Sequence, residues 1–289
     1  MEKVKVLVTG STGTTGRPTV EALLAKGIAV RALVHKEDAR SARLQELGAE
    51  IFMGDMKNLD DMRLAWAGIK RGYFCYPVRP DILDVTVIFA EAAKEAGAEL
   101  IVNMSQKQVA PTVKSPATIR HFLSEEVFKW SGIPTTQLRP TFFADWFLYV
   151  TRQIRAGQLK MSFPADATHA PVAGEDLGRT IATILANPQP HAGKTYQLFG
   201  PELLTYTQLG EIISEVLNKN IKYEHVSAQE MADLIGVGSF GHLVAHIANT
   251  EGDNVYGPPN FNHTIEEITG VPPMSFRHFI EKNRAAFIA

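Results

Sequence analysis

The sequence predicts an α/β fold built on a doubly wound parallel sheet with helices on both faces. Strand-like runs and helical patterns alternate through the first half of the chain, which is the order that parallel strands with crossover helices require. A glycine-rich turn joins the first strand to the first helix, as is typical of such folds. The 289 residues are 45% hydrophobic and 21% charged, so the chain can bury a sizeable core.

The first element is a strand over residues 4–8, followed by a turn and a helical pattern over about 14–26. In the turn, Gly10 permits a tight bend, Gly13 lets the backbone approach a phosphate, and Gly16 lets helix and strand pack closely. The helix N-terminus offers free N–H groups to an anion. The flanking strand and helix favour a Rossmann-type dinucleotide site over a purely structural turn. The expected contacts are Gly10, Thr12, Gly13, Thr14, Thr15 and Gly16.

Five more strands are expected in the first half, at 29–34, 50–53, 71–76, 99–104 and 135–138. Helical patterns separate them at about 38–47, 58–67, 82–96 and 117–131. In open parallel sheets, ligands bind outside the carboxyl ends of the strands, where the strand order reverses. The residues that directly follow each strand are therefore the candidates for a site.

The alternation stops beyond Pro140. A helix over 146–155, an irregular segment, a return helix near 175–186 and a last strand over 194–198 are expected next. Helical patterns then cover about 205–217, 227–236, 239–249 and 274–287, with a break rich in Gly, Pro and Asn at 252–260. These later pieces contain too few strands for an independent sheet.

The sequence therefore predicts two domains. Residues 1–155, with a return helix and strand at about 174–199, form the NAD(P)-binding Rossmann domain. Residues 156–173 and 200–289 form a smaller, mostly helical C-terminal capping domain that binds substrate.

Charge and cysteine content narrow the function classes. The formal net charge is −2 and the basic residues are scattered, so no electrostatic footprint for nucleic acid or an anionic membrane is present. Cys75 is the only cysteine, which rules out an internal disulfide and suits a reducing compartment. No leader peptide or run of 18 apolar residues is present. We expect a cytoplasmic monomer or homodimer that acts on a small molecule and has no nucleic-acid or membrane partner.

Several further motifs extend the pattern beyond the glycine turn. They are Val30-Arg31-Ala32-Leu33-Val34, Gly54-Asp55, the pair His121 and Glu125, Leu138-Arg139-Pro140, Asp176, and Gly270-Val271-Pro272-Pro273. With these residues the chain resembles the NmrA-like family of atypical short-chain dehydrogenases. That group includes triarylmethane reductase, NADPH-quinone oxidoreductase and the ergot-alkaloid dehydrogenases. The resemblance covers nearly the whole chain.

The end of the second strand bears on cofactor choice. An NAD site normally has an acidic residue there, whereas this chain has Val34, followed by His35 and Lys36, with Arg40 a turn later. This charge pattern favours NADP(H) over NAD(H), although the basic residues could also be ordinary solvated loop residues. The resemblance and the strand-end positions imply further cofactor contacts at Asp55, Met56, Pro77, Val78, Met104, Pro140, Phe142 and Phe143.

The resemblance also implies hydride transfer, but the usual catalytic pair is replaced. Short-chain dehydrogenases typically carry a Tyr-x-x-x-Lys pair where this chain has His121 and Glu125. At i and i+4 these two share a helix face, which permits a hydrogen bond that orients the imidazole and supports its charged form. Ser105 matches the place of the family's substrate-polarising serine. We expect Ser105 and His121 to be catalytic, and the alternative is that His121 and Glu125 together brace their helix against the sheet.

Loss of the Tyr/Lys pair favours acceptors that need no protein acid, such as quinones, imines and conjugated carbonyls. Trp146, Phe147 and Phe163 suit a flat aromatic substrate. The expected function is an NADP(H)-dependent oxidoreductase, and the alternative is an NAD(P)-binding redox sensor of the NmrA type that regulates a partner without turnover. His242 and His246 are spaced to face one metal ion, but no acidic third ligand accompanies them and we expect no metal site.

Overall fold

The computed structural model describes residues 5–113, 115–251 and 261–288. Its centre is a seven-stranded sheet of order β3-β2-β1-β4-β5-β6-β9 in which all neighbouring strands are parallel. The strands are β1 (Lys5–Val8), β2 (Ala29–Val34), β3 (Glu50–Met53), β4 (Arg71–Phe74), β5 (Leu100–Met104), β6 (Thr135–Pro140) and β9 (Thr195–Leu198). The predicted fold class is confirmed.

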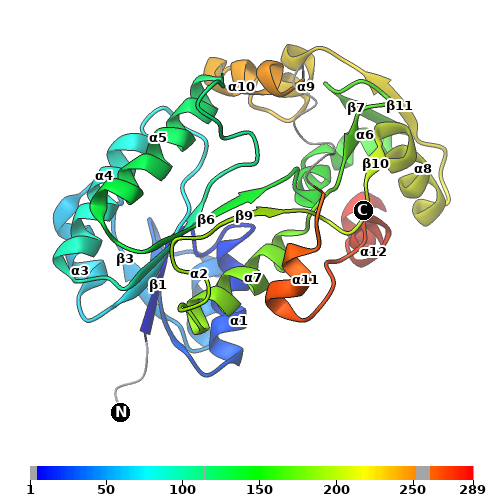
Figure 1. Ribbon diagram of the computed structural model, residues 1–289. Helices are drawn as coiled ribbons and strands as arrows, with labels where there is room; N and C mark the ends of the chain where they lie inside the picture. The colour runs from blue at the N-terminus through cyan, green and yellow to red at the C-terminus, as the bar shows by residue number, and fades with distance from the viewer. Residues whose placement is uncertain (1–4, 114, 252–260, 289) are drawn as a thin grey trace.

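Helices cover both faces of this sheet (Figure 1). One face carries α1 (Gly16–Ala25), α2 (Ala39–Glu46), α7 (Gly174–Ala186) and α11 (Thr264–Thr269). The other carries α3 (Leu59–Trp66), α4 (Ile82–Glu95) and α5 (Pro116–Ser131). β1 shows that both faces of the sheet are buried. Val6 and Val8 enter the core under α1 and α7, while Leu7 enters the core under α3 to α5.

The strand order reverses at β1. Val6 pairs with Val30 of β2 on one side and with Arg71 of β4 on the other. The crevice at the carboxyl ends of β1 and β4 is therefore the expected ligand position of this sheet.

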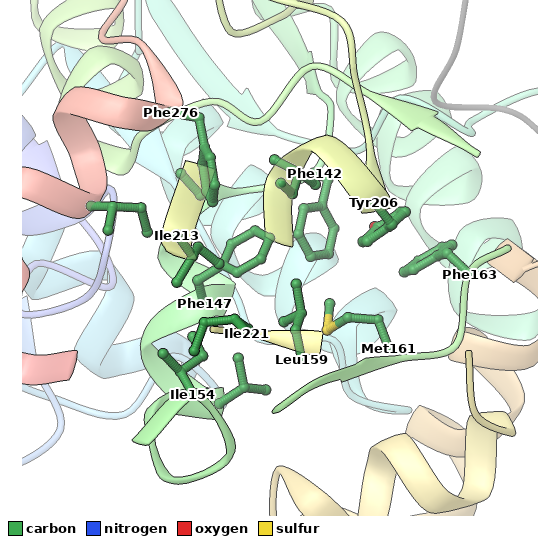
Figure 2. Close-up of a cluster of buried hydrophobic side chains, with 14 of the residues drawn as sticks. Phe142, Phe147, Ile154, Leu159, Met161, Phe163, Tyr206, Ile213, Ile221 and Phe276 are labelled. Atoms are coloured by element: carbon green, nitrogen blue, oxygen red, sulfur yellow. The ribbon is translucent and has the colours of Figure 1, made fainter. Parts of the chain in front are cut away.

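The remaining elements form a cap with its own apolar core. They are η1 (Ala144–Val150), α6 (Thr151–Arg155), β7 (Gln158–Met161), β8 (Thr168–His169), β10 (Leu204–Thr205), α8 (Tyr206–Leu217), β11 (Lys222–His225), α9 (Ala228–Leu234), α10 (Gly241–Glu251), α12 (Phe276–Lys282) and α13 (Arg284–Ile288). Figure 2 shows that Phe147, Leu159 and Tyr206 from three of these elements meet Phe276 in one cluster. No described helix has the length and apolar character needed to cross a membrane.

The cap departs from the sequence-based expectation in its strands. The segment expected to be irregular contains β7 and β8, which pair with β11 and β10 in two small sheets. The expectation that these later pieces lack strands for a sheet of their own is therefore wrong. Each pair joins residues 35 or more positions apart, as in Lys222 with Gln158 and Leu204 with His169, so no local pattern signals it.

Three helix predictions also need correction. The helix expected over 146–155 is a 3-10 helix over Ala144–Val150 followed by α6. The closing helix expected over 274–287 is two helices, because the chain turns at Asn283 between α12 and α13, and α11 was not expected. Spacing of apolar residues does not separate three from 3.6 residues per turn over so short a segment. The expected break at 252–260 lies outside the described residues.

Candidate functional site

A cavity of about 270 Å³ opens at the carboxyl ends of β4, β5 and β6. The cap covers it with Met231 from α9 and with His246 and Ile247 from α10, which packs beside α5 (Figure 1). Its other lining residues are Cys75, Tyr76, Pro77, Val78, Met104, Ser105, Gln106, Gln108, His121, Pro140, Thr141, Phe142, Phe143, Trp146 and Phe163. The cavity thus lies between the sheet and the cap, beside the point where the strand order reverses.

Most of the residues predicted from strand-end positions meet in this cavity. Those it brings together are Ser105, His121, Pro77, Val78, Met104, Pro140, Phe142, Phe143, Trp146 and Phe163. Among the predicted catalytic and substrate residues Phe147 is the exception, because its side chain is fully buried in the core of the cap, 4.7 Å from Phe276 between ring centroids. Phe147 faces away from the cavity because it is one residue from Trp146 on a tight helix.

The glycine turn is tight and brings two stretches of backbone close together. Gly10 adopts a φ of +57°, and a Cβ on Gly16 would lie 2.1 Å from the Gly10 carbonyl oxygen. Thr15 is the N-cap residue of α1 but makes no side-chain capping bond, so it leaves the first N–H groups of the helix free of side-chain partners. Its hydroxyl bonds the Tyr73 hydroxyl at 2.7 Å instead. Gly13 is exposed, whereas Thr12 and Thr14 are half-buried beside it.

The predicted 2′-phosphate residues lie in the loop between β2 and α2 and in the first turn of α2. His35 and Lys36 are exposed. Arg40 already has a partner, since its guanidinium bonds the Asp38 carboxylate at 2.6 and 3.0 Å. This hydrogen bond lowers the pKa of Asp38 to about 2. Asp38 also caps α2 by accepting from the backbone of Arg40 and Ser41, a role that sequence reasoning missed.

The predicted adenine contacts follow β3. The Asp55 carboxylate accepts a hydrogen bond from the Lys57 backbone N–H at 2.9 Å, which fixes this turn. Met56 is buried against the core under α3. These two residues belong to the same strand-end edge as the glycine turn, because β3 is next to β2 in the sheet.

The expected hydrogen bond between His121 and Glu125 is not formed. Glu125 instead accepts from the Arg139 guanidinium at 2.9 and 2.5 Å, and Ser105 donates its hydroxyl to the same carboxylate at 2.6 Å. Arg139 is on β6, beside β5 and its following residue Ser105, so the sheet brings the ion pair together. The role proposed for Glu125 from helix spacing is therefore wrong.

The expectation of a charged imidazole is also wrong. His121 is buried, and burial together with the nearby His246 lowers its pKa to about 4. Burial likewise lowers the pKa of His246 to about 4, and its Nδ1 lies 3.2 Å from the Ser115 hydroxyl. At neutral pH both imidazoles are therefore uncharged.

Sequence reasoning missed several lining residues. They are Cys75, Tyr76, Gln106, Gln108, Thr141, Met231, His246 and Ile247. The i, i+4 spacing of His242 and His246 is a sequence signal for a shared helix face, but it does not distinguish a metal site from the wall of a cavity. Among the described residues no group of three His, Cys, Asp or Glu could hold one. Met231 and Ile247 come from helices more than 80 residues beyond the aromatic segment that they face.

Comparison with known proteins places this geometry in a family. The family model described as the NmrA-like family matches residues 2–282. An NAD(P)H azoreductase of Xenophilus azovorans is 24% identical over 98% of this chain and 99% of its own length. The solved structure of Citrobacter sp. triphenylmethane reductase complexed with NADP(H) has a TM-score of 0.83 at 21% identity, covering 96% of this chain and 99% of the reductase.

NmrA, a negative transcriptional regulator solved in complex with NADP, has a TM-score of 0.82 at 20% identity. The similarity covers 98% of this chain and 95% of NmrA. Fold similarity at this identity therefore includes an enzyme and a regulator alike. Since the family model spans nearly the whole chain, the protein belongs to the NmrA-like family.

Proposed function

We propose that the protein is an NAD(P)H-dependent reductase of a small quinone, imine or conjugated carbonyl compound. The cavity at the carboxyl edge of β4 to β6 carries this proposal, because aromatic side chains and the expected cofactor contacts line the same space. Phe142 and Trp146 present nearly parallel rings, with 6.2 Å between centroids and 22° between planes. A flat conjugated ligand fits against such rings. The naming of family relatives as reductases supports the same reaction class.

The cofactor, when bound, supplies a hydride, and the residues of this chain hold and orient the acceptor. The glycine turn and the start of α1 bind the pyrophosphate, while Pro77, Met104 and Pro140 border the nicotinamide side. Met231 and Ile247 cover the cavity and exclude bulk water from the acceptor. The reduced anion takes its proton from solvent water after it leaves the cavity, because the low pKa values of His121 and His246 make their protonated forms scarce at neutral pH.

We propose NADP(H) as the preferred cofactor. His35 and Lys36 are exposed directly after β2, where an acidic residue would disfavour the 2′-phosphate. Arg40 contributes less to this site because Asp38 already neutralises it.

The test is NADPH oxidation, followed by the loss of its absorbance, with quinones, triarylmethane dyes, cyclic imines and enones as acceptors. Trp146→Ala, which removes a cavity wall, should lower kcat/KM about tenfold, whereas Trp130→Ala, an exposed tryptophan on α5, should not change it. Turnover of one acceptor class with this variant pattern supports the proposal. Tight NADPH binding without turnover of any acceptor overturns it.

The second candidate is an NAD(P)-binding redox sensor. It is favoured by one observation, since neither histidine that lines the cavity has a pKa suited to donating a proton at neutral pH. A sensor should bind NADP⁺ and NADPH with different affinities and show no turnover. Titrating both forms of the cofactor beside the oxidation assay therefore separates the two functions.

A further inference from the structure

Two buried polar side chains line the cavity without hydrogen-bond partners. The Thr141 hydroxyl and the Gln108 amide nitrogen are both shielded from solvent, and the residues are only 3% and 5% exposed. Buried donors in folded proteins nearly always have a partner, because an unsatisfied donor costs free energy. Two such donors on one cavity therefore point to a ligand that supplies the acceptor atoms.

Three neighbouring polar groups of the cavity already have partners. Ser105 gives its only proton to Glu125 at 2.6 Å, so it cannot also donate to a substrate oxygen. The Gln106 side-chain oxygen accepts from Thr118 at 3.2 Å. His246 contacts the Ser115 hydroxyl. The neutral imidazole of His121 adds a donor and an acceptor nitrogen but no charge.

The backbone holds both donors in place. Thr141 directly follows β6, and its N–H bonds the Leu198 carbonyl of β9 at 2.9 Å. The loop that carries Gln108 is fixed by two bonds, from the Lys107 N–H to the Pro140 carbonyl and from the Val109 N–H to the Gln106 carbonyl. The donors thus come from segments that follow two adjacent strands, so a rotation of the side chain, without movement of the backbone, brings each donor to a ligand in the cavity.

The cavity carries no formal charge. No Asp, Glu, Lys or Arg is among its lining residues within the described parts of the chain, and the two histidines are neutral at physiological pH. A cation or anion that entered would lose hydration without meeting an opposite charge. An uncharged ligand avoids this cost.

Building on the proposed function, we propose that Thr141 and Gln108 are the specificity-determining donors of this site. They bind the oxygen of an uncharged carbonyl acceptor, such as a quinone or enone, and disfavour cationic dyes, iminium ions and sulfonated compounds. This assigns substrate recognition to two residues that follow the strands, in place of Ser105.

The experiment compares two ligands of the same ring skeleton, naphthoquinone and naphthalene. Their binding is measured calorimetrically with NADP⁺ present, so that no hydride is transferred. The unmodified protein should bind naphthoquinone about tenfold more tightly than naphthalene, the difference expected of two neutral hydrogen bonds. In the double variant Thr141→Val, Gln108→Met this preference should disappear while naphthalene affinity stays the same.

The matched control is Gln153→Met. Gln153 is also a buried glutamine with an unpartnered amide nitrogen, but it lies outside the cavity and should leave the preference intact. Equal affinity for the two ligands in the unmodified protein, or a preference that survives in the double variant, overturns the proposal. Naphthoquinone preference without any NADPH turnover supports the site and contradicts the proposed reductase. Turnover without preference supports the reductase and overturns the site.

Discussion

At the scale of single residues, the chemistry of the cavity depends on hydrogen bonds and ion pairs between side chains of different helices and strands. Ser105 is expected at the cavity and lies there. Its hydroxyl, however, donates to the Glu125 carboxylate, which also forms an ion pair with Arg139. Helix spacing places His121 and Glu125 on one face, yet it contains no information about the Arg139 side chain on β6. Position could thus be predicted from the sequence, whereas the hydrogen-bond partners could not.

The ion pair between Glu125 and Arg139 should be a main support of the cavity wall. Glu125→Gln removes one partner of a largely buried pair and leaves Arg139 without a counter-charge, so we expect a loss of about 2–4 kcal/mol in the free energy of unfolding. Urea denaturation measures it.

The matched control is Glu126→Gln, one residue along the same helix. Glu126 pairs with Lys129 at 3.4 Å on the surface, and its loss should change stability by less than about 0.5 kcal/mol. Equal losses of unfolding free energy in the two variants would show that the buried ion pair stabilises the protein no more than the surface pair does.

At the scale of single elements, the strands of the sheet could be predicted more reliably than those of the cap. β1, β2 and β5 are largely apolar runs, and the regular alternation of strands with helices identifies β3, β4 and β6 between them. β7 and β11 are short and half-exposed, and Gln158, Lys160, Lys222 and Glu224 give them a polar character. Their pairing depends on a contact between distant segments that no local pattern contains.

The segment that joins β2 to α2 should select NADPH over NADH. Replacing His35 and Lys36 together with alanine removes the exposed imidazole and ammonium groups after β2, and we expect the ratio of NADPH to NADH affinity to fall about fivefold to tenfold. Arg40→Ala should have a smaller effect, because Asp38 already engages that guanidinium. Fluorescence titration with both cofactors measures the ratios. An unchanged ratio in the double variant rules out this 2′-phosphate site.

Contacts between α10 and α5 should make stability depend on pH. His121 and His246 have folded-state pKa values of about 4, well below the unfolded value of about 6.5. Between these values the unfolded chain binds more protons than the folded chain, so stability falls as the pH falls from 6.5 towards 4 and is not affected by these groups above 6.5. Thermal unfolding across this range should show a decreasing Tm.

His246→Gln should make that decrease shallower, because one buried group no longer takes up a proton on unfolding. His35→Gln replaces an exposed histidine and should leave the slope unchanged. If both variants follow the unmodified protein, the buried His246 is not a cause of the pH dependence.

At the scale of the whole molecule, the cavity lies where the sheet and the cap meet, and a second contact joins them at the ion pair between Glu175 of α7 and Lys282 of α12. The sequence predicts the sheet side of this cavity through its strand ends, and it supplied Ser105, Pro140 and Phe142 correctly as lining residues. The cap side was not predictable, since Met231 and Ile247 reach the cavity only when the apolar core of the cap folds. Ligand binding should therefore stabilise the sheet and the cap together.

That coupling is measurable as the rise in Tm on adding NADPH. At a concentration of about 100 times Kd, binding adds about 2.7 kcal/mol to the free energy of unfolding, which corresponds to a rise of roughly 5–10 °C for a chain of this size. Gly10→Ala should reduce this rise, because alanine at a φ of +57° strains the turn that holds the pyrophosphate.

Gly27→Ala separates this effect from simple destabilisation. Gly27 also has a positive φ, +73°, and neither glycine has a neighbour closer than ordinary contact to a new Cβ. The two variants should therefore lose similar stability without ligand, about 1 kcal/mol each, by the same backbone strain. Only Gly10→Ala should also lose part of the NADPH-induced rise. If the rise is the same in both, the glycine turn does not bind the cofactor, and the cavity beside it would need another explanation.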